Sequence, residues 1–140
     1  MTQEDEELLK DLCSRLSYGV KCQWGTYYKG ILIDVCKCKT KDDFVYWDCY
    51  FEECGDDVPI EIVKPYLRSM SSMTKEEDEE YRKTKIRVAV QWDDYGNPIG
   101  FEFISTFKTF DWLNSHHFDY RGLIKKGLAI KATKEMYETN

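Results

Sequence analysis

The sequence predicts an α+β fold: a curved antiparallel sheet and a β-hairpin, with an N-terminal helix and a C-terminal helix-turn-helix packed on them. Three observations lead to this prediction. Leucines recur at helical spacing near the N-terminus, β-branched and aromatic residues dominate residues 18–63, and a second alternating run at 85–104 surrounds a turn. With 140 residues, of which 42% are apolar, the chain fits one domain (1–140) with a single core.

The first elements are a helix and the curved sheet. Thr2 opens a T-x-x-D pattern, and the leucines that follow predict an amphipathic helix over 3–16 whose other face is acidic. Strands are expected near 18–24, 27–38 and 44–52 and, as a short extended piece, 58–63. Pro65 is expected to end that piece, because proline restricts the residue before it. Strands this short and twisted predict either a small SH3-like barrel or a strongly curved meander over 18–63.

The middle of the chain predicts a short helix and a hairpin. Thr74 and Glu77 have the spacing of a capping box, and acidic residues fill the first turn, so segment 74–83 is expected to hold an exposed helix at about 75–82. The run KIRVAVQWDDYGNPIGFEFI alternates on both sides of a turn and predicts a β-hairpin at 85–104. We expect this hairpin to be central to the core.

The last segment, 109–127, predicts a pair of helices that closes the fold. Thr109 can cap a helix that runs to about His116, and Asp119 can cap a second helix that runs to Lys126. Gly127 is placed to end the second helix in the left-handed conformation that glycine adopts at little cost.

Charge and hydropathy exclude some classes of function. A formal net charge of −6 argues against a sequence-nonspecific nucleic-acid binder, because that mode of binding depends on Lys and Arg displacing counterions from phosphates. No apolar run approaches the roughly 20 residues that span a bilayer, and the N-terminus MTQEDEELLK is acidic where a signal peptide is basic. The protein is therefore expected in the cytoplasm, without a membrane partner.

Six cysteines lie within the first 54 residues, and in the cytoplasm they are expected to be reduced. The strings CKC and CYFEEC can be interpreted as four thiolate ligands for zinc. Structural zinc sites, however, usually pair cysteines two to four residues apart at tight turns, whereas Cys36 and Cys38 fall within a β-like run. We favour cysteines that act as small buried hydrophobic residues on strands, with no metal or other cofactor.

The stretch DWLNSHHFDYRGLIKKGLA is either a site or the closure of the fold. Adjacent histidines, His116 and His117, cannot both face one metal ion from a regular helix, and Asp119 is explained as a helix cap, so closure is favoured. Tyr120 and Arg121 are expected to be exposed, where the pair can stack on a planar or anionic ligand. The candidate residues for a ligand or partner are Tyr120, Arg121, His116, His117 and, on the solvated face of the third strand, Tyr46 and Tyr50.

Three segments, DLCSRLSYGVKC, KPYLRSMSSMTKEE and DWLNSHHFDYRGLIKKGLAIKATKEMY, cover about half of the chain. They resemble segments of a large group of small uncharacterised proteins that are encoded by phages, prophages and mobile elements of gut Bacteroidales. The resemblance implies a phage or prophage origin, and it implies no activity, cofactor or catalytic residue. Ser69 stands where the group commonly has proline, so the rigidity of that turn does not carry over. Residues 23–55 lie outside the resemblance and could carry partner specificity.

Signatures of catalysis are scarce, since the sequence has neither a phosphate-binding loop nor a G-x-S-x-G nucleophile elbow. The first hypothesis is a non-enzymatic phage or prophage accessory protein that binds a host or phage protein, with an anti-defence role among its functions. The alternatives are a binder of a small nucleotide-like ligand, and a hydrolase or metal protein that uses His116, His117 and Asp119. An exposed sheet edge could also pair with a second copy to form a homodimer.

Overall fold

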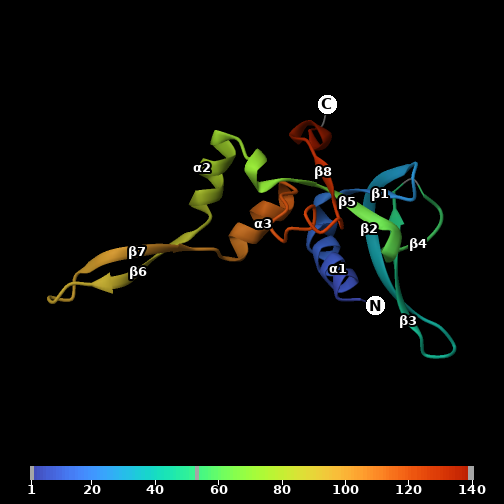
Figure 1. The fold of residues 1–140 in the computed structure, drawn as a ribbon, viewed down its shortest axis with the longest axis horizontal. Coiled ribbons are helices and arrows are strands. Elements are labelled where there is room, and N and C mark those ends of the chain that lie inside the picture. The colour runs from blue at the N-terminus through green and yellow to red at the C-terminus, as the bar shows by residue number, and fades with distance from the viewer. Residues whose placement is uncertain (1, 53, 139–140) are drawn as a thin grey trace.

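The structure is a computed structural model that describes residues 2–52 and 54–138, and it confirms the α+β class (Figure 1). Helix α1 (Gln3–Arg15) begins at the predicted capping box of Thr2 and Asp5 and lies against the main sheet. Within the described residues this sheet has six strands in the order β4-β3-β2-β1-β5-β8. Their bounds are β1 (Lys21–Trp24), β2 (Tyr28–Lys39), β3 (Val45–Phe51), β4 (Val58–Pro59), β5 (Val63–Arg68) and β8 (Ile130–Ala132).

The main sheet is open, so the prediction of a closed SH3-like barrel is wrong. Strand β5 pairs with β1 on one side and in parallel with β8 on the other, which makes the sheet mixed rather than antiparallel throughout. The C-terminal strand thus occupies the edge of β5 that closure of a barrel would need. The predicted end at Pro65 is also wrong, because β5 continues through Pro65, which lies opposite Cys22 of β1. Proline favours an extended residue before it, and that preference suits a strand.

The core lies between α1 and the main sheet. Leu8 and Leu12 of α1 are buried there with apolar residues of the four central strands. The ring of Trp24 stacks on Phe51 with centroids 4.0 Å apart, and Gly30 leaves the space that this stack needs, because a Cβ there would lie 3.2 Å from the indole. The close packing explains why a glycine interrupts a strand at this point.

All six cysteines are free. Cys22 and Cys49 are fully buried on strands as predicted, and burial raises the pKa of the Cys49 thiol to about 12. The same prediction is wrong for Cys36 and Cys13, which are exposed.

The hairpin departs most from its prediction. Helix α2 (Lys75–Lys83) has the predicted capping box, in which Glu77 N donates to Thr74 Oγ1 at 3.2 Å. It leads into β6 (Ile86–Trp92) and β7 (Pro98–Ile104), which form a separate two-stranded sheet that extends away from the main sheet (Figure 1). No residue of either strand is buried, so the expectation that the hairpin is central to the core is wrong.

The predicted C-terminal helix pair is half correct. Helix α3 (Phe107–Ser115) begins at the cap Thr106, and Thr109 completes its capping box instead of beginning the helix. No second helix follows, because Gly122 has a φ of +74° and turns replace the right-handed helix that was predicted to run to Lys126. Asp119 therefore caps no helix, and its carboxylate instead accepts from the backbone N–H groups of Leu123 and Ile124, four and five residues further on. Gly127 is left-handed as predicted, with a φ of +76°. In the described part of the chain, no helix has the combined length and apolarity that crossing a membrane requires.

Candidate functional site

The two histidines lie at the end of α3, where the chain reverses. His117 has a φ of +60°, a conformation that is uncommon for residues other than glycine although histidine is enriched in it. The reversal lets His117 O accept from Arg68 N at 2.7 Å, which joins the segment to the end of β5. The His116 ring stacks on Trp112 at 4.1 Å, whereas the His117 ring stacks on Tyr137 at 3.7 Å. Each imidazole is therefore held by a different aromatic ring.

Both histidines line one surface groove of about 290 Å³, here named the histidine groove. Its walls come from the end of α3, from α2, from β5 and from the C-terminal segment. The lining residues are Tyr18, Arg68, Glu77, Ser115, His116, His117, Lys134, Tyr137 and Glu138. Aromatic rings, two cations and hydroxyl groups thus share one hollow, a composition that suits a small polar ligand.

Charges inside the histidine groove are largely compensated. Arg68 donates to both carboxylate oxygens of Glu77, at 2.7 and 2.8 Å, and both side chains are buried. The hydrogen bonds from Arg68 lower the pKa of Glu77 to about 2. Burial, reinforced by the charge of nearby Arg15, lowers the pKa of His117 to about 3. At neutral pH the His117 imidazole is therefore uncharged, and its pKa is far from the value that suits a general base at that pH.

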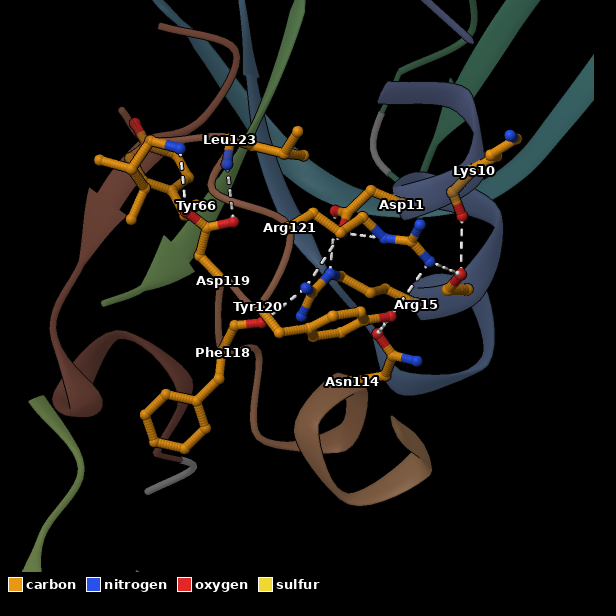
Figure 2. Close-up of polar contacts among 12 residues, drawn as sticks. Lys10, Asp11, Arg15, Tyr66, Asn114, Phe118, Asp119, Tyr120, Arg121 and Leu123 are labelled. Atoms are coloured by element: carbon orange, nitrogen blue, oxygen red, sulfur yellow. Dashed lines mark hydrogen bonds and ion pairs between the residues drawn. The ribbon is translucent and has the colours of Figure 1, made fainter. Parts of the chain in front are cut away.

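Tyr120 and Arg121 do not form the exposed pair that the sequence predicts. They point inward, between α1 and α3, and both are only partly accessible (Figure 2). Tyr120 OH donates to Asn114 Oδ1 at 2.9 Å, while Arg121 donates to Ser14 Oγ at 3.0 Å and to Tyr120 OH at 3.1 Å. Arg121 Nε also lies 3.4 Å from Asp11 Oδ1. The pair joins the C-terminal segment to α1 and does not face a ligand.

The centre of this contact is an ion pair that sequence reasoning missed. Asp11 and Arg15 of α1 are both 0% exposed, with Arg15 Nε 2.9 Å from Asp11 Oδ2 and Nη2 3.0 Å from Oδ1 (Figure 2). Arg15 Nη2 also donates to Phe118 O at 2.6 Å. The sequence did contain a signal for this ion pair, because Asp11 adjoins Leu12 on the helix face that carries Leu8. A charged pair at positions i and i+4 is, however, usually assigned to the solvated face.

Tyr46 and Tyr50 lie far from the histidines in the order of the main sheet. Both are half-buried on β3, which β2 and β1 separate from β5 and the histidine groove. Between them Asp48 is buried, and burial together with the neighbouring Asp57 raises the pKa of its carboxyl. The structure therefore places the six candidate residues in three separate regions.

The third hypothesis needs His116, His117 and Asp119 in one cluster. Asp119 Oδ1 and Oδ2 instead accept from Leu123 N and Ile124 N, each at 2.9 Å. Across residues 2–52 and 54–138, no three His, Cys, Asp or Glu side chains gather in a group that could hold a metal ion.

A further unexplained surface is the β6–β7 hairpin, residues 86–104, here named the hairpin arm. Its register sets Ile86 opposite Ile104 on one face and Arg87 opposite Phe103 on the other, so apolar side chains occupy both faces. Trp92 is 57% exposed, Phe103 65% and Tyr95, in the turn, 90%. Periodicity located these residues, but it gave no indication that they are exposed.

A hollow lies where the hairpin arm meets α2. Its volume is about 370 Å³, and it is lined by Asp78, Tyr81, Arg82, Lys85 and Phe103. Lys85 Nζ lies 4.6 Å from the Tyr81 ring centre, within the range of a cation–π contact. The base of the arm thus presents cations beside aromatic rings. No protein-family model, no curated protein and no solved structure matches this chain, so the geometry of these surfaces is what bears on its function.

Proposed function

We propose that this chain is a non-enzymatic interaction protein that binds another protein, of host or phage, through the hairpin arm. The observation that carries the proposal is that the arm exposes apolar side chains on both faces and buries none of its strand residues. A two-stranded hairpin is at best marginally stable by itself in water. Contiguous exposed apolar patches of this kind mark interaction surfaces in soluble proteins.

The arm offers enough apolar area for a stable complex. Trp92, Tyr95, Phe101 and Phe103 are 57%, 90%, 41% and 65% exposed. At roughly 200 Å² for each aromatic side chain, they leave roughly 500 Å² to be covered. Covering that area contributes about 12 kcal/mol before the entropy of association is subtracted. The gain from the aromatic side chains offsets the loss of translational and rotational freedom on binding. The exposed Ile86, Val90, Ile99 and Ile104 add apolar area beyond it, so the arm could sustain specific association.

The sequence supports a setting for this interaction. The resemblance of three segments to phage and prophage proteins of gut Bacteroidales supports an accessory protein that acts in the host cytoplasm. The net charge of −6 suits a partner with a cationic surface, including a nucleic-acid-binding protein of a defence system. An anti-defence role therefore belongs to the proposal.

Affinity capture from the native host, with chemical cross-linking, tests the proposal. The arm variant Trp92→Lys/Phe103→Glu changes two exposed side chains on the arm, and the control Tyr27→Lys/Phe44→Glu makes the same changes on the main sheet and its loops, where the residues are also exposed. We expect the wild type and the control to retain the same cross-linked protein and the arm variant to lose it, with all three unfolding at similar temperatures. Retention of that protein by the arm variant would contradict the proposal.

The histidine groove supports a second candidate function, the binding of a small nucleotide-like ligand. Tyr137, which stacks on the buried His117 ring, provides an aromatic wall, and Lys134 provides a cation in the same groove, whereas Arg68 is already paired with Glu77. A nucleotide would stack on Tyr137 and place its phosphate near Lys134. Thermal-shift measurements against mono-, di- and cyclic nucleotides, repeated with Lys134→Ala, test this function. If no nucleotide changes the melting temperature from that of the protein alone, this function is rejected.

A further inference from the structure

We infer that the protein partner of the hairpin arm is a second copy of this chain, with the two arms antiparallel about a two-fold axis. The tip of each arm then lies in the hollow at the base of the other. This inference rests on the proposed function, because it names the protein that the arm binds. It depends on three properties of the arm: its charge polarity, the hollow at its base and its uncovered area.

Opposite charges gather at the two ends of the hairpin arm. Asp93 and Asp94 lie at the tip, in the turn, whereas Arg87 lies at the base and Lys83 and Lys85 lie just before it. Glu102 of β7, opposite Val88, is an acidic residue near the base, where the basic residues outnumber it. Asp93 Oδ1 accepts from Tyr95 N and Asn97 N, each at 2.9 Å, and this holds the turn in place. These backbone bonds also lower the pKa of Asp93, so the tip is anionic at neutral pH.

Two-fold symmetry makes this polarity self-complementary. When two arms lie antiparallel, each acidic tip meets a basic base, and the favourable pairing occurs twice. Parallel arms would instead set the two acidic tips side by side. A seven-residue strand is about 24 Å long, and both arms have the same length, so one tip reaches the base of the other arm when the register is complete.

The hollow at the base of the arm suits the tip. It is about 370 Å³ in volume and is lined by Tyr81, Phe103, Lys85 and the ion pair of Arg82 Nε with Asp78 Oδ2, which lie 3.0 Å apart. Tyr95 is 90% exposed at the tip and follows Asp94 directly in the chain. In this hollow the ring of Tyr95 would meet Tyr81 and Phe103, and the Asp94 carboxylate would meet Lys85, whose Nζ lies 4.6 Å from the Tyr81 ring centre.

The uncovered surface of the arm is large enough for such a dimer. Its aromatic side chains alone leave roughly 500 Å² per copy, which is more than half of the roughly 800 Å² per partner in a standard interface. The exposed aliphatic residues add to this area. Since β6 and β7 pair only with each other among the described residues, each also has one free backbone edge that could hydrogen-bond to its symmetry mate.

Sedimentation equilibrium of the full chain between about 1 and 100 μM, with variants in which the sign of one side-chain charge is reversed, tests the inference. We expect a dimer whose Kd rises at least about tenfold with Asp94→Lys and with Lys85→Glu, because each change sets like charges together at tip and base. The double variant Asp94→Lys/Lys85→Glu restores opposite charges and is expected to return the Kd to within about threefold of the wild type. Asp42→Lys, an equal change of charge at an exposed residue of the β2–β3 turn, is the matched control and leaves the Kd unchanged.

The outcomes separate this inference from the proposed function. A wild-type chain that is monomeric at 100 μM, or single variants that dimerise like the wild type, would overturn the inference. If arm-dependent capture of another protein persists in that case, the proposed function stands without it. If Trp92→Lys/Phe103→Glu changes neither dimerisation nor the capture of another protein, the inference and the proposed function are both wrong. All of the exchanged side chains are at least partly exposed, so the variants are expected to fold, and near-UV circular dichroism checks that they do.

Discussion

Removal of the Asp11 carboxylate is the sharpest test of how α1 is held to the C-terminal segment. In Asp11→Asn the Arg15 guanidinium, which is 0% exposed, loses its anionic partner and keeps only neutral acceptors, Phe118 O and the amide oxygen of the new side chain, and Arg121 loses the same carboxylate. An uncompensated buried charge costs about 3–5 kcal/mol. For a chain of 140 residues, that loss corresponds to a fall in Tm of roughly 10–20 °C. Urea unfolding followed by tryptophan fluorescence gives the free energy directly.

The arrangement also predicts an asymmetry between the two partners. Arg15→Met should be less damaging than Asp11→Asn, because the Asp11 carboxylate still lies 3.4 Å from Arg121 Nε. The double variant Asp11→Asn/Arg15→Met removes charge from both partners and should be less destabilised than the sum of the single variants by at least about 1 kcal/mol. Additive effects, or a loss below about 1 kcal/mol in Asp11→Asn, would refute the buried ion pair.

Three further predictions concern acid sensitivity and packing. Glu77 titrates at about 2 in the folded chain and ordinarily at 4.5, so its contribution of about 3 kcal/mol is complete above pH 4.5 and is lost as pH falls toward 2. Between pH 4.5 and 2 the urea midpoint of Glu77→Gln should fall less than that of the wild type. An equal change of the midpoint with pH in both proteins would count against the bonds from Arg68. His117 titrates at about 3 instead of 6.5, so between pH 6.5 and 5 the unfolded chain takes up a proton that the folded chain does not, and the wild type loses about 2 kcal/mol. His117→Asn, which tolerates the left-handed backbone and does not titrate, should be nearly insensitive to pH in that window; an unchanged pH dependence would show that another group is responsible. Gly30→Ala should cost about 1–3 kcal/mol and shift the fluorescence of Trp24, since the added Cβ would lie 3.2 Å from the indole; a wild-type melting temperature would mean that the ring moves freely.

Local features of the fold could be predicted from the sequence because neighbouring residues determine them. The capping boxes at Thr2 and Thr74 set the starts of α1 and α2, and alternation located β2 and β3 to within one residue. Gly127 keeps its predicted left-handed backbone, whereas Asp119, predicted as a helix cap, instead accepts from backbone N–H groups four and five residues further on. These signals involve residues at most a few positions apart, so tertiary contacts need not be known.

The errors concern contacts between distant segments. Parallel pairing of β8 with β5 joins residues about 64 positions apart, as in Tyr66 and Ile130, and no short pattern indicates it. An alternating hairpin has the same pattern whether its faces are covered or exposed, so the position of the hairpin arm could not be deduced. The histidine groove depends on Tyr137 reaching His117 from the C-terminal segment, and the buried pair of Asp11 and Arg15 depends on Phe118. Sequence reasoning named the histidines, but it could not name the residues around them.

The bond from Arg15 to Phe118 O has a consequence for synthesis of the chain on the ribosome. The two residues are 103 positions apart, so at about 5–20 residues per second the arginine is made roughly 5–20 s before its acceptor. During that interval the nascent chain presents an incompletely matched charge next to the leucines of α1. A growing chain that lacks residues beyond 117 is therefore expected to be a substrate for chaperones, and this fold should be completed only after Phe118 has left the ribosome.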